Sequence, residues 1–111
     1  MRLVATLLLA ASSVSALGAR PTADDPRLQG GYSFKQGGWT FVHLQGTPEQ
    51  IGFQHGYLLA REIEDNLHVY QVEGMHSDGR PWSFFREAGR TVLWPRLDQE
   101  YKDELKGMRM G

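Results

Sequence analysis

Four histidines are the side chains in this sequence best suited to acid–base or metal chemistry: His43, His55, His68 and His76. No two of them form a His-Glu-x-x-His pair, and the chain has no cysteine that could complete a zinc site. Acidic residues near the C-terminus have the spacing of a solvated helix face and not of a paired acid and base: Asp98, Glu100, Asp103 and Glu104. We therefore predict no metal site, no cofactor and no catalytic residue in these 111 residues.

His55 is the histidine with the most unusual neighbours. It follows Gln54 and lies beside Gly52 and Gly56 on the predicted apolar face of a helix. A core histidine bonded to a backbone carbonyl is the favoured interpretation, because a lone histidine rarely marks a site. The alternative is that His55 binds substrate, and it is the one candidate site residue that the sequence offers.

The helix that carries His55 is predicted from several signals that agree. Thr47 can cap its first turn, Pro48 suits the first helical position, and Gln50 can complete a capping box with Thr47. Apolar residues then recur at steps of three and four: Ile51, Leu58, Leu59, Ile63, Leu67 and Tyr70. We expect one long amphipathic helix within residues 46–72.

Small residues form a ridge along that helix, at Gly52, Gly56 and Ala60. A glycine costs roughly 1 kcal/mol of helix propensity relative to alanine, so two of them indicate that another backbone, or a ligand, comes very close. The same helix contains charged residues such as Arg61 and Glu62, which exclude a membrane-spanning helix that dimerises through glycines. Close packing within the fold is the favoured explanation.

The residues before the helix predict irregular chain and then β structure. Residues 20–31 contain two prolines and two closing glycines, which argue against regular structure. Tyr32 and Phe34 can begin a short strand, and residues 39–44 have strong β composition. Apolar groups on both faces of 39–44 predict a covered strand and not an isolated hairpin arm.

Two more helices are predicted after the long one. Glu73-Gly74 should end the long helix, and Pro81 should start a second helix that continues to Leu93. Pro95 disfavours helical geometry at Trp94, so we expect a break there before a third helix with its apolar side on residues 97–108. The fold class is therefore α+β, with an N-terminal strand and about three helices.

Composition and the N-terminus predict an exported globular chain. Hydrophobic residues make up 41% and charged residues 23%, and the net charge of −1 gives no reason to expect nucleic-acid or anionic-membrane partners. Residues 1–18 have the charged start, apolar run and small residues of a signal peptide; a retained membrane anchor is less favoured because the apolar run is short. We predict a signal peptide over 1–18, a polar linker over 19–37 and a domain portion over 38–111, in the periplasm or secreted.

The predicted elements carry more apolar surface than they can cover. All twelve aromatic residues lie between Tyr32 and Tyr101, and the apolar stripe of the last helix continues to the final residues. One strand with two apolar faces and three amphipathic helices leave faces without a partner. We therefore expect the structure to be incomplete without a further part.

Residues 38–56, Gly-Trp-Thr-Phe-Val-His-Leu-Gln-Gly-Thr-Pro-Glu-Gln-Ile-Gly-Phe-Gln-His-Gly, resemble the N-terminal block of penicillin-acyltransferase-type N-terminal-nucleophile hydrolases. The related phospholipase B-like proteins open similarly. Residues 94–107 resemble the family's following helices more weakly. The resemblance implies an αββα sandwich and a precursor that cuts itself before a cysteine, whose α-amino group then serves as base for its own thiol. That cysteine is missing here, so the resemblance supplies no catalytic residue.

Together these features predict an N-terminal fragment or α-chain of an exported, self-cleaving acyltransferase or hydrolase, inactive alone. Its partner would be the cysteine-bearing half or β-chain of the same enzyme, acting on amide or ester acyl bonds. The alternative is a small exported helical module, without enzymatic activity, that binds a protein partner through an exposed apolar face.

Overall fold

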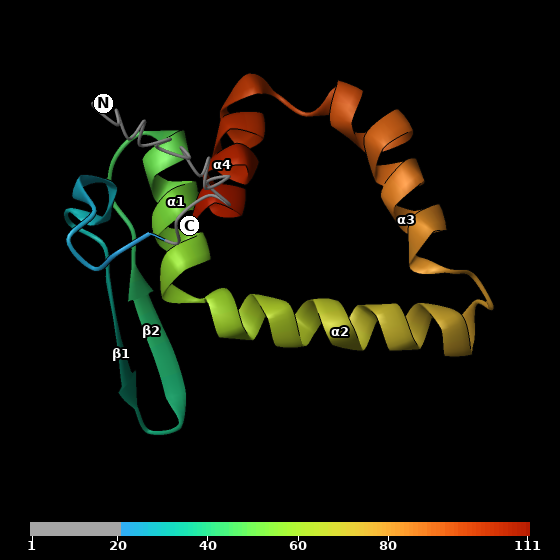
Figure 1. Ribbon diagram of the computed structural model, residues 1–111, viewed down its shortest axis with the longest axis horizontal. Helices are drawn as coiled ribbons and strands as arrows, with labels where there is room; N and C mark the ends of the chain where they lie inside the picture. Colours follow the sequence, from blue (N-terminus) through green and yellow to red (C-terminus); the bar gives the residue numbers. More distant parts are fainter. Residues whose placement is uncertain (1–20) are drawn as a thin grey trace, which may run out of the picture.

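The computed structural model describes residues 21–111, so the predicted signal peptide lies outside the described residues. It contains a two-stranded antiparallel sheet and four α-helices, which confirms the α+β class (Figure 1). The elements follow in the order η1 (Pro26–Leu28), β1 (Tyr32–Gln36), β2 (Trp39–His43), α1 (Pro48–Leu58), α2 (Ala60–Ser77), α3 (Trp82–Ala88), η2 (Gly89–Leu93), η3 (Trp94–Arg96) and α4 (Gln99–Met110). Short 3-10 turns form η1 and η3, and η2 is a π-helical turn. The predicted linker over 19–37 thus contains two ordered elements, η1 and β1.

Strands β1 and β2 form a hairpin around a two-glycine turn. Gly37 and Gly38 have φ angles of +58° and +81°, which the tight turn needs and glycine adopts without strain. The register pairs Tyr32 with His43 and Phe34 with Phe41, so these four rings lie on one face of the ribbon. Their centroids are 5.0 Å and 5.1 Å apart in the two pairs.

The prediction of a strand covered on both faces is wrong for this structure. The hairpin projects away from the helices as an isolated arm (Figure 1), and Trp39 near its tip is 73% exposed. The aromatic composition of the strand indicated burial, but none of the described helices lies over its aromatic face. The β structure is therefore predictable from local sequence, whereas its covering is not.

The capping box at the start of α1 is confirmed. The Thr47 hydroxyl accepts from the Gln50 amide at 3.3 Å, and the Gln50 side-chain carbonyl accepts from the Thr47 amide at 2.9 Å. The prediction of one continuous helix is wrong, because the chain bends at Leu59, where φ is −119° and ψ is 22°. Helix α2 leaves α1 steeply at this point (Figure 1) and runs to Ser77, three residues beyond the predicted end.

The bend at Leu59 occurs without a local helix breaker. No proline or glycine occupies residues 57–60, and bonds from the Leu59 amide to His55 and from the Ile63 amide to Leu59 flank the bend. Helix α1 stays against α4, whereas α2 extends away from both (Figure 1). An amphipathic period continues through such a bend, so the sequence pattern could not reveal it.

Helices α1 and α4 pack backbone to backbone. A Cβ atom on Gly52 or Gly56 would collide with the carbonyl oxygen of Glu104 or Met108 in α4. Glycines in α4 and at its C-terminal end make the same kind of contact with α1. A Cβ on Gly107 would collide with the carbonyl oxygen of Glu49, and a Cβ on Gly111 would collide with that of Phe53. Close helix packing, the interpretation that the sequence favoured, thus explains the two glycines of the ridge, Gly52 and Gly56.

The segment after α3 differs from the predicted break at Trp94. Trp94 is helical, with φ −52° and ψ −44°, and the chain extends only at Leu97, where ψ is 140°. Pro95 occupies an early position of the 3-10 turn η3, where no N–H is required of it, so it follows a helical residue without losing a bond. The transition is spread over a π turn and a 3-10 turn instead of one kink.

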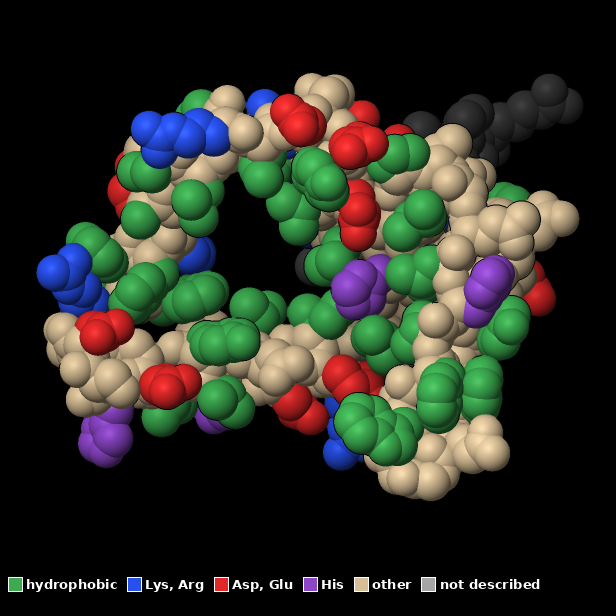
Figure 2. Space-filling model, turned by 180° about the vertical axis from the view of Figure 1, so that it is seen from behind, with side chains coloured by type: hydrophobic (Ala, Val, Ile, Leu, Met, Phe, Trp, Pro, Cys, Tyr) green, Lys and Arg blue, Asp and Glu red, His purple; other side chains and the backbone are tan. Residues whose placement is uncertain are grey.

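Buried residues are few in the described chain: Gly52, Phe53, Gln54, Gly56 and Gly107. Among residues 21–111, Phe53 is the one hydrophobic residue whose side chain is fully buried. Helices α2 and α3 extend from the α1–α4 pair as an open ring, and Figure 2 shows an opening through its middle. The core is therefore confined to α1, α4 and the turn that precedes β1.

Candidate functional site

The best-ordered polar site surrounds Gln54, in the middle of α1. Its side chain is 1% exposed, and its Nε2 lies 2.9 Å from the Arg27 carbonyl oxygen, 3.2 Å from that of Gln29 and 2.8 Å from that of Gln45. Its Oε1 accepts from the Gln45 amide at 2.8 Å. One side chain thus holds the turn before β1 and the connection after β2 against the same helix.

The amide of Gln54 is chemically matched to this position. A glutamine amide offers two N–H donors and one carbonyl acceptor, so its donors serve three carbonyl oxygens by sharing, while its acceptor takes the remaining backbone N–H. Glutamate could not donate to those carbonyls. The absence of a side chain at Gly31 makes room, because a Cβ there would lie 2.7 Å from the Gln54 side chain.

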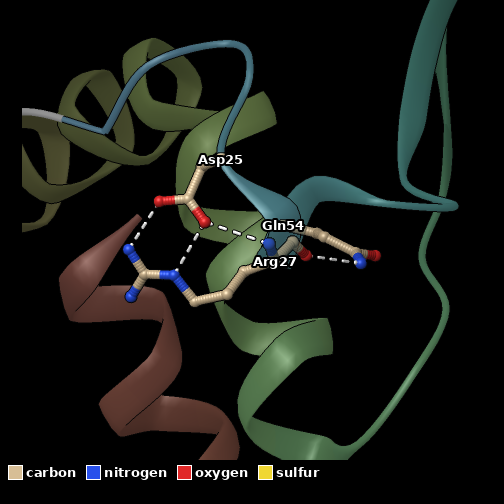
Figure 3. A network of polar contacts seen from close by, with 3 residues as sticks. All are labelled: Asp25, Arg27 and Gln54. Carbon is tan, nitrogen blue, oxygen red and sulfur yellow. Dashed lines mark hydrogen bonds and ion pairs between the residues drawn. The ribbon is translucent and has the colours of Figure 1, made fainter.

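Asp25 and Arg27 form an ion pair beside Gln54 (Figure 3). Asp25 accepts from the Arg27 backbone amide at 3.0 Å and from the guanidinium at 2.9 Å and 2.7 Å. The hydrogen bonds from Arg27 lower the pKa of Asp25 from 3.8 to about 2. The guanidinium carbon lies 3.8 Å from the centroid of the buried Phe53 ring, so the ion pair covers the one large apolar side chain of the core.

His55, the candidate substrate-binding residue, follows this cluster in α1. It is half-buried in the last turn of the helix, and within residues 21–111 its ring makes no hydrogen bond. The favoured prediction of a core histidine bonded to a backbone carbonyl is therefore wrong for residues 21–111, and a role in substrate binding stays a prediction.

The other histidines do not gather around His55. His43 stacks on Tyr32 in the hairpin, while His68 and His76 are exposed on α2. In the part of the chain that the structure describes, no three His, Asp or Glu side chains are arranged to hold a metal ion.

Among the acidic residues of α4, Asp103 makes side-chain hydrogen bonds within the described chain. The Asp103 carboxylate accepts from Gln99 at 2.7 Å and from Lys106 at 3.3 Å, and these two bonds lower its pKa. Glu104 contributes its backbone, whose carbonyl faces Gly52. The described helix face is thus one of local polar pairs.

Gln54 and Arg27 are the structurally important polar residues that the sequence did not single out. A glutamine between an apolar residue and a histidine in a helix gives no indication of backbone partners more than 20 residues away. The one available signal was its position between two glycines of a predicted buried face. Arg27 lay in a stretch whose prolines and glycines predicted irregular chain.

Comparison with known proteins adds no assignment. A scan against protein-family models, a search of curated proteins and a search of solved structures each found no match. Among residues 21–111, no helix combines the length and the apolar character needed to cross a membrane.

Proposed function

We propose that this chain is the N-terminal portion, or α-chain, of an exported self-cleaving acyltransferase or hydrolase of the penicillin-acyltransferase type. A cysteine outside these residues would supply the nucleophile for amide or ester acyl transfer. The signal peptide over 1–18 would direct export. In this scheme residues 38–111 provide a scaffold, and His55 borders the substrate pocket.

One observation carries the proposal. Within α1 the buried residues are Gly52, Phe53, Gln54 and Gly56, which are the centre of the block that resembles the family. Two of them permit the backbone contact with α4, and Gln54 fastens the hairpin to the helix. The shared residues therefore have a scaffold role, as the resemblance implies for this block.

Exposed apolar surface supports the need for a second part. Large hydrophobic side chains are exposed on the hairpin, α2, η2 and α4; Phe34, Val69, Leu93 and Tyr101 are each at least 47% exposed. An isolated two-stranded hairpin is marginal in water, and a sheet that packs its aromatic face would be stabilised by further strands. A cysteine-bearing half could extend the sheet at its edge and pack a second layer on this aromatic face.

The coding DNA that follows the codon of Gly111 tests the proposal. We expect a continuing or adjacent reading frame that contains a cysteine followed by Ser or Thr and by apolar strand patterns. The purified chain alone should not hydrolyse amide or ester substrates, and co-expression with that second frame should restore hydrolysis. Turnover by the chain alone, without any cysteine, would contradict the proposal.

The exposed aromatic face also favours the second candidate, a non-enzymatic exported module that binds a protein partner. Unrelated downstream sequence, together with no hydrolase activity in any combination, would favour this module.

A further inference from the structure

The corner where α2 meets α3 lies across the ring from α1 (Figure 1). Residues of α2 and α3 line a recess at this corner. Its volume is about 260 Å³, near the lower end of the roughly 300–1,000 Å³ typical of small-molecule sites. The lining combines aromatic and acidic side chains with one hydroxyl: Tyr70, Trp82, Phe85, Glu73, Asp78 and Ser77. None of these residues takes part in the proposed acyl transfer.

The walls of the recess are built by a glycine and a proline. A Cβ on Gly74 would lie 2.8 Å from Cε2 of Phe85, so the phenyl ring packs directly on the α2 backbone. Pro81 fixes the start of α3 with φ −70°. This start places Trp82 beside Phe85, with ring centroids 6.2 Å apart and planes inclined by 35°.

The charges at this corner favour a cation. Glu73 and Asp78 contribute carboxylates, and the C-terminal end of the 18-residue helix α2 adds the negative end of its dipole. No basic side chain lines the recess. His76 is exposed on the last turn of α2, and the Arg80 guanidinium is held over Phe84, 4.3 Å from the ring centroid.

We propose that this recess binds a small organic cation, a trimethylammonium group such as that of choline. Aromatic rings combined with carboxylates recognise quaternary ammonium groups, because the rings attract the cation without requiring hydrogen bonds from it. The volume is large enough to hold one such group. The site is independent of the acyltransferase proposal, since it uses different residues and requires no cysteine.

Calorimetric titration of the full chain tests the site, with tetramethylammonium and choline as probes. The control ligand is the neutral isostere of choline, in which tert-butyl replaces trimethylammonium. We expect both cations to bind and the isostere to bind at least roughly tenfold more weakly. Sedimentation with phosphatidylcholine vesicles distinguishes the source: binding to vesicles assigns a lipid headgroup, and binding of the free cations alone assigns a soluble ligand.

Variants locate the site within the chain. Trp82→Leu should weaken cation binding roughly tenfold, and the matched variant Trp94→Leu, at another half-exposed tryptophan, should leave it unchanged. Glu73→Gln, at an exposed position, should weaken binding while preserving the circular dichroism spectrum, which separates lost recognition from lost folding. Equal binding of the neutral isostere, no binding of either cation, or unchanged affinity in both Trp82→Leu and Glu73→Gln would overturn the proposal.

Discussion

Gln54 determines how the N-terminal turn, the hairpin and α1 come together at the scale of single residues. Its buried amide provides the only side-chain hydrogen bonds found between α1 and residues 27–29 in the described chain. Leaving a buried donor or acceptor without its partner costs more than the hydrogen bond itself contributes, because the group has lost water as well. A single amide can therefore control the local stability of this corner.

The Gln54→Met variant keeps the length of the side chain and removes its donors and acceptor. We expect the free energy of local opening at the Gln45 amide to fall by about 1–3 kcal/mol, because backbone groups lose their partner. Native-state hydrogen exchange measures it. Gln71→Met, at an exposed position of α2, is the matched control and should change opening by less than about 0.5 kcal/mol. Equal effects of the two variants would contradict the role given to Gln54.

The low pKa of Asp25 predicts that the stability of the fold depends on pH in acid. Its folded-state pKa of about 2 lies below the ordinary 3.8, so the ion pair stabilises the fold above that ordinary value. This contribution should be lost as the pH falls through about 2. Carbon-detected NMR titration of the Asp25 carboxyl should show the low midpoint, and Arg27→Met should return the midpoint toward 3.8. A midpoint near 3.8 in the unmodified chain would show that the pair does not persist in solution.

At the scale of elements, the α1–α4 pair depends on glycines that face carbonyl oxygens of the opposite helix. Gly52→Ala should destabilise the pair by about 1–3 kcal/mol, because the helices must separate to admit a methyl group. Loss of stability would distinguish a packed glycine from an exposed one, because replacing an exposed helical glycine by alanine stabilises a helix by about 1 kcal/mol. Gly89→Ala is the matched control, because a Cβ there meets no atom within 4 Å. Hydrogen exchange of the α4 amides measures the effect of both variants. If Gly52→Ala stabilised α4, the close packing of α1 on α4 would be contradicted.

The sequence predicted the elements whose signals are local. The capping box at Thr47, the strand composition at 39–43 and the glycine ridge at Gly52 and Gly56 each have a physical cause within a few residues. The bend at Leu59 has no proline or glycine at residues 57–60 to announce it, and Trp94 is helical although Pro95 follows it. The periodicity of residues 46–72 continues through the bend and therefore could not reveal it.

The candidate site also combines a residue that the local sequence indicated and one that only the structure revealed. His55 was recognisable as unusual because of its glycine neighbours, but its position gives no hydrogen-bond partner among the described residues. Gln54 was adjacent in sequence and equally visible. Its partners at Arg27, Gln29 and Gln45 become neighbours only after the chain folds back, so its role required the structure.

At the scale of the whole molecule, buried contacts are concentrated in α1 and α4. Helix α2 contains no buried residue and α3 contains none, although both carry aromatic and aliphatic side chains. Most helical stability in proteins comes from packing an apolar face, and these two helices have little to pack against. We therefore propose that residues 21–111 need a covering partner to complete their core.

Thermal melting of residues 20–111 alone, followed by circular dichroism, tests this claim most directly. We predict a clear helical signal that is lost gradually, without a cooperative transition, because the exposed helices lack a shared core. Aggregation on heating would have the same meaning, since exposed apolar faces would then pair between molecules. A sharp, reversible and cooperative transition would contradict the claim, because it would show that these residues close a core of their own.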